Sequence, residues 1–453
     1  MVSVVGKMSL ASCLTVSLLL LRSWIQPTWD VSGVSTFAGA SVKGRVLAEL
    51  DRRKDELLKL CCDVVRIPSE NPPGDTTAVA DFLTRYIEGK GIKVKRYEPK
   101  KGMHNLVAVI EGTRDKPNFV LNAHMDEFIA DVGKPWSFPP FAGEIKQGKI
   151  LGRGVSDMKG GLAASLFAFV LVKELGISLP GKLTMTLVSD EESGGKWGAE
   201  WLLDNVPEAR GDACINGEPS GTDQMTIGEK AGNWFKLTAS GISQHAAYST
   251  DGNAVVKMAK ALVAAQGLRE LAGVPPADIK RLVDESKAIA EAEVGKGAGR
   301  GVDHVVVNAG TIRGGVKVNM VPAVCEAELD TRAPWGVSSE QVRLELEKRF
   351  KEAGVGDIKY DFLIRNEPNY TSPNDRLVQI VQNNAKQQTG KEPQLTISLG
   401  LTDLRFWRRK GIPALYFGPR FYGMAGVDEY ITIEDLLTVA RVHAGTVADY
   451  FGT

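Results

Sequence analysis

The segment NFVLNAHMDEF, residues 118–128, decides the expected fold, because a mostly apolar run ends there in a histidine and two acidic residues. Residues 118–123 are typical of a buried strand, and His124 and Asp126 follow directly at its end. A second segment, KLTMTLVSDEE at 182–192, repeats the pattern with a strand over 182–188. Potentially reactive side chains therefore begin where each of these strands ends.

Helices alternate with these strands along the first half of the chain. The spacing of apolar residues predicts helices over 42–65, 78–89 and 158–175, and a further strand over 105–111. Such alternation indicates an α/β fold whose mainly parallel sheet is flanked by helices. Ligands of these sheets gather beyond the carboxyl ends of the strands, so we expect the functional site at that edge.

From about residue 226 the order of elements changes. Strands over 233–240, 304–312, 323–331 and 358–365, with helices over 254–271 and 340–352, predict a compact βαββαβ-like, ferredoxin-like α+β unit. A helix over 376–389, a strand over 414–417 and a helix over 433–450 then resume the first pattern. We therefore expect a leader (1–41), a first domain in two parts (42–225 and 367–453), and a second domain inserted between them (226–366).

Composition excludes several classes of protein. The 453 residues are 43% hydrophobic and 24% charged, close to the average of globular proteins. The 55 basic and 55 acidic residues balance, which argues against a nucleic-acid partner. Five scattered cysteines without CxxC spacing exclude a disulfide scaffold.

The amino terminus resembles a targeting signal. Residues 8–21, MSLASCLTVSLLLL, are uncharged, follow Lys7 and are too short to span a bilayer comfortably. We expect a secretory signal peptide, cleaved near the small residues 38–40, and a mature protein in the secretory lumen or outside the cell without a stable membrane span. The alternatives are an uncleaved signal anchor and a disordered leader on a cytoplasmic protein.

One histidine and several carboxylates fall on loops at the predicted sheet edge. Besides His124, these are Asp157 before a helix, Glu191 and Glu192 after a strand, and Glu218 in the sequence GEP. Taken singly, each residue is more simply a helix cap, a solvated charge or a hydrogen-bonded histidine. Taken together they form the ligand set that zinc prefers, and a carboxylate that bridges two ions would allow a two-metal hydrolytic centre.

Eight blocks of sequence, in order, carry a resemblance to a known family: LNAHMDEF, WSFPPFAGEIKQGKILGRGVSDMKGG, SDEESGG, NGEPSG, SQHAA, VNMVPAVCEAELDTR, LTDLRFW and GIPALYFGP. The chain beyond residue 45 resembles the M20 metallopeptidases, which include acetylornithine deacetylase, succinyl-diaminopimelate desuccinylase, aminoacylase and glutamate carboxypeptidases. The resemblance implies a zinc-peptidase-like catalytic domain, and it makes the inserted domain a lid that also mediates dimerisation.

The resemblance also implies a metal centre. His124, Asp157 and Glu218 would bind one ion, and Asp157 would bridge to a second ion that also takes Glu192. We expect one or two Zn²⁺ per chain, with Co²⁺ or Mn²⁺ as alternatives, since histidine and carboxylate ligands accept all three. Glu191 would be the general base that activates the attacking water.

Further roles follow from the same resemblance. Asp126 would hydrogen-bond to His124 and fix its tautomer. His245 would reach into the active site of a partner subunit and stabilise the oxyanion, which implies a homodimer. Asn319 and Arg332 would bind the carboxylate of a small N-acyl amino acid or dipeptide-like substrate, although Arg332 could instead pair with Asp330.

One position departs from the family pattern. The last metal ligand of the family, a histidine, is replaced by Ala425 in the segment MAGVDE (424–429), and His443 falls in a predicted helix past this motif. Three explanations stay open: hydrolysis with a single tight metal, an enzyme repurposed for acyl transfer, condensation or cyclisation on an amino-acid scaffold, or a non-catalytic binding pseudoenzyme.

Overall fold

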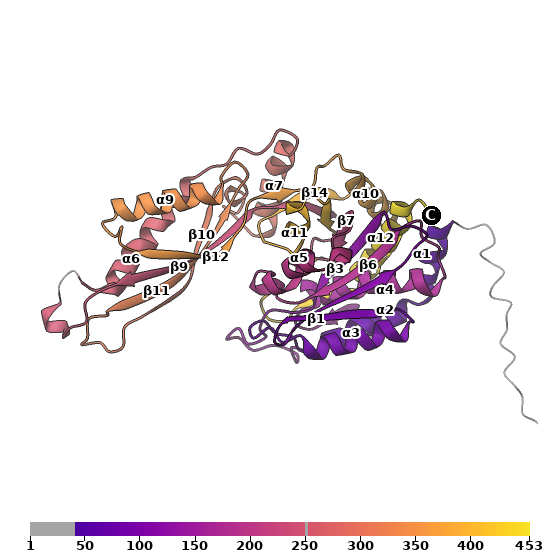
Figure 1. Cartoon of the computed structure of the whole chain (residues 1–453), viewed down its shortest axis with the longest axis horizontal. Coiled ribbons are helices and arrows are strands. Elements are labelled where there is room, and N and C mark those ends of the chain that lie inside the picture. Colours follow the sequence, from indigo (N-terminus) through magenta and orange to yellow (C-terminus); the bar gives the residue numbers. More distant parts are fainter. Residues whose placement is uncertain (1–40, 250–251) are drawn as a thin grey trace, which may run out of the picture. The chain divides into compact units, whose positions relative to one another are not determined.

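The computed structural model describes residues 41–249 and 252–453. The expectations for the leader, from signal peptide to localisation, therefore lie outside the described residues apart from Ser41. The predicted α/β class is confirmed, because the chain forms a large mixed sheet covered by helices and a separate four-stranded sheet with helices of its own (Figure 1). A further three-stranded sheet has the order β16-β5-β4.

The larger sheet has nine strands, with the order β1-β2-β6-β3-β7-β15-β8-β13, and β14 also pairs with β8. Its central strands β6, β3, β7 and β15 run parallel, as the alternation predicted, whereas β1 and β2 are antiparallel additions at one edge. The carboxyl ends of the parallel strands carry the site. The strand bounds are β1 Val94–Lys100, β2 Met103–Ile110, β3 Asn118–His124, β6 Lys182–Val188, β7 Ala213–Asn216, β8 Gln224–Glu229, β13 Asn369–Tyr370, β14 Gln394–Ser398 and β15 Ala414–Tyr416.

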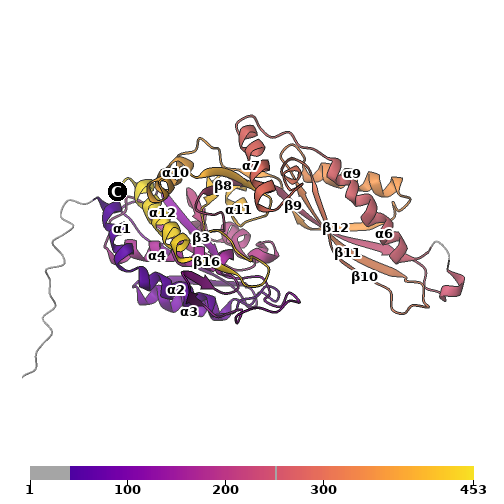
Figure 2. The same ribbon diagram turned by 180° about the vertical axis from the view of Figure 1, so that it is seen from behind.

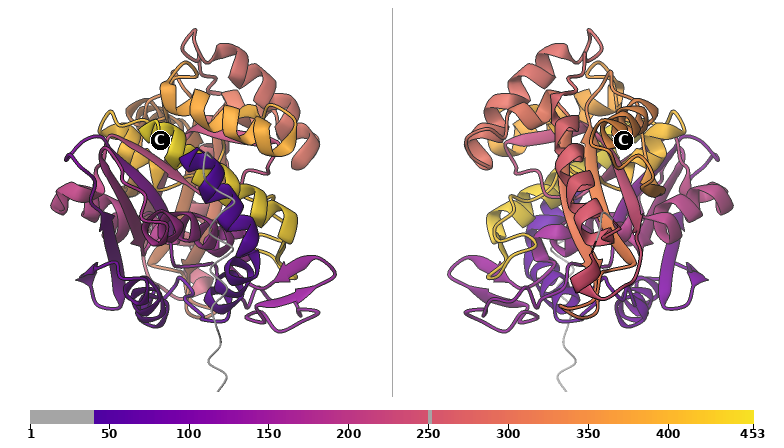
Figure 3. Two further views of the ribbon diagram at one scale, coloured as in Figure 1. Left: turned by 90° about the vertical axis from the view of Figure 1, so that its right-hand side faces the viewer. Right: turned by 90° about the vertical axis from the view of Figure 1, so that its left-hand side faces the viewer.

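Helix α4, Gly160–Glu174, lies in the centre of the larger unit and is buried over almost its whole length. It packs against β3 and against α12, Ile433–Phe451, which in turn contacts α1 and α10 (Figures 2 and 3). Gly161 is required at its start, because a Cβ there would lie 2.0 Å from the carbonyl oxygen of Gly217. This close approach brings the loop of Glu218 to the beginning of the helix. The other helices are α1 Val42–Arg52, α2 Lys54–Val65, α3 Thr77–Gly89, α5 Trp201–Asn205, α10 Arg376–Thr389 and α11 Leu404–Arg409.

The smaller sheet has the antiparallel order β10-β11-β9-β12 that the βαββαβ pattern predicts. Helices α6 and α9 pack against each other, and α6 covers the sheet through a core that includes Phe235, Leu329 and Leu346. Strand β9 follows β8 after the single residue Lys230, so the chain passes from one sheet to the other there. The bounds are β9 Ala231–Ser240, α6 Ala254–Ala265, β10 Val306–Gly314, β11 Val324–Ala333, α9 Ser339–Glu352 and β12 Lys359–Arg365.

The structure differs from the expected elements at several places, of which two matter most here. The helix predicted over 42–65 is broken into α1 and α2 at Arg53, whose φ of −107° leaves the helical region. Helix α7, Lys280–Glu293, was not predicted, although its apolar residues recur at helical spacing. It packs against β14 of the larger sheet and, with the short helix α8 (Arg300–Asp303), belongs to the larger core through Ile279, Leu282 and Val302. The predicted division into domains stays a prediction.

One described segment is long and apolar enough to cross a membrane, Val155–Glu174, with a mean hydropathy of 1.5. In the fold 94% of this window is buried, because it forms the central helix α4. Its apolar character is thus accounted for by packing inside the protein. The remaining elements, which form the three-stranded sheet, are β4 Glu144–Lys146, β5 Lys149–Leu151 and β16 Tyr430–Thr432.

Candidate metal centre and substrate pocket

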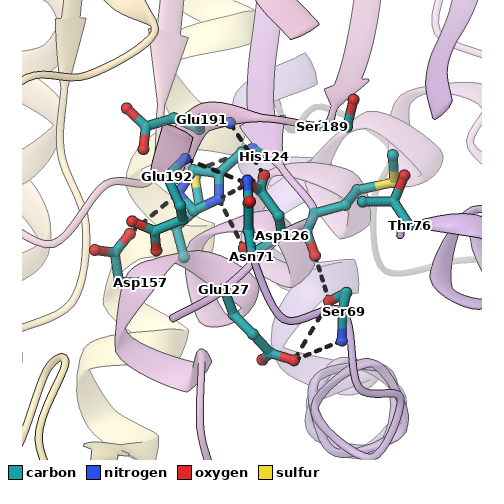
Figure 4. Close-up of polar contacts among 12 residues, drawn as sticks. Ser69, Asn71, Thr76, His124, Asp126, Glu127, Asp157, Ser189, Glu191 and Glu192 are labelled. Atoms are coloured by element: carbon teal, nitrogen blue, oxygen red, sulfur yellow. Dashed lines mark hydrogen bonds and ion pairs between the residues drawn. The ribbon is translucent and has the colours of Figure 1, made fainter. Parts of the chain in front are cut away.

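His124, at the end of β3, meets two carboxylates from distant parts of the chain. Its Nε2 lies 3.0 Å from Oδ1 of Asp157 and 3.5 Å from Oε1 of Glu218. One ligand atom from each of the three residues lies within 4.8 Å of the others. Figure 4 shows His124 and Asp157 joined in this way, with Glu192 close to them. The structure therefore brings together the three residues predicted to bind the first ion.

The other nitrogen of the His124 ring fixes its orientation. Nδ1 lies 2.9 Å from the backbone oxygen of Asp126, which accepts only, so Nδ1 donates and Nε2 is free to bind a cation. The expected partner was the side chain of Asp126, but its Oδ1 lies 3.6 Å away. The tautomer is thus set by the backbone of Asp126, with its carboxylate in support.

The Asp126 carboxylate instead holds the loop that carries the two glutamates. It accepts the backbone N–H groups of Glu191 at 3.3 Å and Glu192 at 3.1 Å, and an N–H of the Asn71 amide at 2.8 Å. The Asn71 side-chain oxygen in turn accepts the hydroxyl of Ser193 at 2.7 Å. Asn71 was missed from the sequence, because nothing local links it to a loop more than a hundred residues away.

The buried carboxylates of this site favour the binding of a cation. Burial raises the pKa of Glu218 and of Glu192 well above the usual carboxyl range, and the Asp157 carboxylate raises both further. Oε1 of Glu218 and Oε1 of Glu192 are buried and have no hydrogen-bond partner among the described residues. Buried carboxylates in such number are stable only when paired or bound to a metal. The donor set therefore fits a divalent ion.

Glu191 lies beside this ligand group but does not belong to it. Burial raises the pKa of its carboxyl to about 8, and Asp403 adds to the shift while His124 and Arg405 oppose it. Nη1 of Arg405 lies 3.7 Å from Oε1 of Glu191, and Arg405 is itself fixed by the carbonyl oxygens of Thr402 and Gly194. A carboxyl group whose pKa is raised toward neutrality is suited to proton transfer, which is the role that the family resemblance implied for Glu191.

A buried hydrogen-bond network holds the loop that carries Asp157. Both carboxylate oxygens of Glu429 accept backbone N–H groups of the preceding loop, from Ser156 at 2.8 Å and from Gly154 at 3.1 Å. Gly154 is required, because its φ is +76° and a Cβ there would lie 2.2 Å from Oε2 of Glu127. The loop is therefore held in one conformation before any ligand arrives.

Ala425 lies on the wall of the same pocket, at a φ of +56°. Its methyl group offers no donor atom, so position 425 itself cannot supply a metal ligand. His443 does not replace it. The latter is buried in α12, where Nε2 lies 2.8 Å from the carbonyl oxygen of Phe417 and Nδ1 lies 2.9 Å from the hydroxyl of Ser165.

The metal centre opens into a cavity of about 510 Å³. The cavity extends from Asp157, Glu191, Glu192 and Glu218 to Arg332 on β11. Arg332 pairs with Asp330 as the alternative interpretation proposed, through Nε at 2.9 Å and Nη2 at 2.9 Å. Its Nη1 has no partner among the described residues, so Arg332 keeps a donor for a ligand.

Two predicted site residues lie elsewhere in this chain. His245 and Asn319 are exposed and do not line the cavity. They are neighbours, because His245 pairs with Met320 in a β-bridge and the backbone oxygen of Asn319 accepts the N–H of Ala246 at 3.1 Å. Within one chain the structure thus separates this pair from the metal ligands.

Comparisons with known proteins identify similar sequences and structures. The model of Peptidase family M20/M25/M40 matches residues 120–449. The N-formyl-4-amino-5-aminomethyl-2-methylpyrimidine deformylase of Halalkalibacterium halodurans is 27% identical over 433 residues, which cover 88% of this chain and 96% of the relative. The succinyl-diaminopimelate desuccinylase of Rhodospirillum centenum is 28% identical over 405 residues, which cover 87% of this chain and 97% of the relative.

Solved structures share the fold. The M20 family metallo-carboxypeptidase Sso-CP2 from Sulfolobus solfataricus superimposes with a TM-score of 0.75 at 21% identity, covering 88% of this chain and 100% of its own. A dinuclear metal-binding M20 peptidase from Bacillus subtilis gives a TM-score of 0.61 at 15% identity, covering 89% and 99% of the two chains.

Proposed function

Because the chain belongs to peptidase family M20/M25/M40, we propose that it is a metal-dependent amidohydrolase. Its substrate is a small N-acyl amino acid or a dipeptide-like molecule with a free carboxylate. The similar deformylase, desuccinylase and metallo-carboxypeptidase support hydrolysis of a C–N bond as the reaction class. The observation that carries the proposal is the buried group of His124, Asp157 and Glu218 with Glu191 beside it.

The ligands present favour one tightly held ion. His124, Asp157 and Glu218 would hold it, whereas a second ion would find only Asp157 and Glu192, since position 425 is an alanine. Zinc is the expected metal, with cobalt or manganese as alternatives. A bound ion of this kind supplies Lewis acidity and lowers the pKa of water toward neutrality.

Glu191 moves the proton in the proposed reaction. Its carboxylate takes a proton from the water whose oxygen attacks the amide carbon. It then delivers that proton to the amide nitrogen as the C–N bond breaks, which yields a carboxylic acid and an amine. The raised pKa of about 8 suits both steps, because the group must accept and release a proton near neutral pH.

In this proposal His245 and Asn319 contribute to an active site through dimerisation. A homodimer, in which each lid domain reaches the partner's pocket, gives the exposed pair a role that it does not have within one chain. His245 then donates a hydrogen bond to the developing oxyanion, and Asn319 contacts the substrate. Exposed apolar residues beside this pair, Ile242, Val318 and Met320, are consistent with a surface that another subunit covers.

Amine release from a panel of N-acyl amino acids and dipeptides, with zinc added, tests the function. We expect turnover in the wild type, a loss of at least about a hundredfold in Glu191→Gln, and no change in the exposed control Glu88→Gln. Full activity of Glu191→Gln would contradict its role. Binding without turnover would identify a pseudoenzyme, and transfer of the acyl group to an added amine would identify a repurposed enzyme.

A further inference from the structure

Besides Oε1 of Glu192, Oε1 of Glu218 and Nε of Arg405 at the candidate metal centre, three further buried polar groups that line the cavity have no hydrogen-bond partner among the described residues. They are Nη1 of Arg332, Nε1 of Trp234 and the hydroxyl of Ser286. A buried donor without a partner is energetically costly, so unpaired groups that share one cavity point to a ligand. Two of the three, Arg332 and the indole of Trp234, can only donate. The missing partner is therefore an acceptor.

Arg332 and Trp234 project from the same face of the smaller sheet. Trp234 on β9 stands directly opposite Asp330 on β11, and Arg332 lies two residues further along β11. Side chains of directly opposite residues share a face, and so do residues two apart on one strand. Asp330 occupies Nε and Nη2 of Arg332, which leaves Nη1 of this cavity-lining residue without a partner among the described residues.

Ser286 comes to this cavity from a different element. It lies on α7 and is 4% exposed. Helix α7 packs against β14 of the larger sheet, so its position does not depend on the β9–β11 pair. Donors from two separately anchored elements thus line one space.

The local charge also favours an anion. Lys230, next to the start of β9, donates to the carbonyl oxygens of Gly301 and His304 and forms no ion pair with a carboxylate of the described residues. Burial, with a smaller contribution from the nearby Arg332 guanidinium, lowers its pKa to about 7. Lys230 thus carries a partial positive charge near pH 7, which Asp303 partly offsets, while Asp330 balances the charge of Arg332.

We propose that Trp234 and Ser286 complete, together with Arg332, a three-donor site for the carboxylate of the substrate. The proposal rests on the proposed function and adds two specificity-determining residues to it. A carboxylate offers about four lone-pair sites, so it can accept from an indole, a hydroxyl and a guanidinium at once. Hydrogen bonds to a charged acceptor are stronger than neutral ones, so this site selects acids over their uncharged amides.

Binding of matched acids and amides to zinc-loaded Glu191→Gln protein tests the site without turnover. The probes are N-acetyl-L-leucine, N-acetyl-L-phenylalanine and N-acetyl-L-glutamate, each with its α-carboxamide, and affinity is measured by calorimetry. We expect Trp234→Phe and Ser286→Ala each to weaken binding of the acids about tenfold and to leave the amides unchanged. Each change removes one hydrogen-bond donor. Phenylalanine keeps an aromatic ring at position 234, and alanine keeps the Cβ at position 286.

Matched controls separate this effect from general damage. Trp335 also has a buried indole N–H without a partner, and Thr84 has such a hydroxyl, but neither residue lines the cavity. Trp335→Phe and Thr84→Val should therefore leave the affinity for acids unchanged. Equal weakening of acid and amide, equal effects of the controls, or no binding of any acid would overturn the proposal. If the wild type releases amine but binds acids and amides equally, the proposed hydrolysis is still supported and the carboxylate site is refuted. If it prefers acids over amides but shows no turnover, the proposed hydrolysis is refuted and the carboxylate site is not.

Discussion

Nη1 of Arg153 lies 2.6 Å from Oε2 of Glu429, and both side chains are almost completely buried. This ion pair joins the loop that carries Ala425 to the loop that presents Asp157. Nη2 of Arg153 also donates to the backbone oxygen of Gly426 at 2.5 Å. The segment around position 425 is therefore held beside the metal centre even though its side chain is only a methyl group.

Restoring the missing ligand should change metal content. In Ala425→His we expect close to one additional zinc per chain by elemental mass spectrometry, and about a tenfold or greater gain in kcat/KM. The φ of +56° at this position is one that His and Asn adopt more readily than most residues. Ala425→Asn is thus the control, and it should add no metal. An unchanged metal content in Ala425→His would show that the pocket is remodelled beyond this residue.

Breaking the Arg153–Glu429 pair should destabilise the protein. Arg153→Met leaves a buried carboxylate without its partner, which costs about 3–5 kcal/mol of unfolding free energy. The double variant Arg153→Met/Glu429→Gln removes that charge and should recover part of the loss. Urea unfolding of the two variants measures both effects. Equal stability of the single and double variants would contradict this explanation.

Mixing two inactive subunits tests whether His245 acts across a dimer. Glu191→Gln and His245→Ala should each lose activity, but their heterodimer contains one site with an intact Glu191 and an intact partner histidine. If subunits exchange freely, half of the dimers are mixed and half of their sites are complete, so about a quarter of wild-type activity should return. A mixture of His245→Ala with His245→Asn is the control. No recovery in the first mixture, with exchange shown by mass spectrometry, would argue that His245 acts within its own chain or not at all.

Acid should weaken the fold through His443. Burial lowers its pKa to about 4 from an ordinary value of 6.5, because the imidazole lies deep in the core, although the Phe417 carbonyl opposes the shift. Between these values the unfolded chain binds a proton that the folded chain does not, so this contribution is complete above pH 6.5 and is lost as the pH falls toward 4. The slope from this residue reaches about 1.4 kcal/mol per pH unit.

Urea unfolding at intervals between pH 7.5 and 4.5 measures this slope. In His443→Gln the part of the slope that belongs to residue 443 should disappear, while the absolute stability at pH 7.5 falls. His304→Gln is the control, because that histidine is only half-buried. The same slope in His443→Gln and wild type would assign the acid sensitivity to other groups.

Local sequence patterns were sufficient to predict the strands that end beside the candidate metal ligands. The apolar strands before His124 and Glu191 were predicted because a buried parallel strand is a short apolar run with a sharp polar end, which is visible in sequence. Helix α7 was missed although its apolar spacing is helical, because charged and glycine-rich residues surround it. Its place against β14 depends on contacts that no local pattern contains.

The residues that support the site were hardest to predict. Asn71 and Arg153 act through partners distant in sequence, and the proposed roles of Trp234 and Ser286 depend on a cavity that only the fold forms. Even for Asp126, where the spacing to His124 predicted a contact, only the structure shows that the backbone oxygen fixes the ring and that the carboxylate holds the next loop.

The sequence by itself thus determined the fold class, because it depends on local periodicity, and through the resemblance to a family it predicted the first metal ligands and the missing ligand at position 425. The tertiary structure decided which groups complete the site. Pairing of β9 with β11 places Trp234 beside Arg332, and packing of α7 against β14 brings Ser286 to the same cavity. Those relationships arise from long-range packing, in which residues far apart in the chain meet only once the whole core has formed.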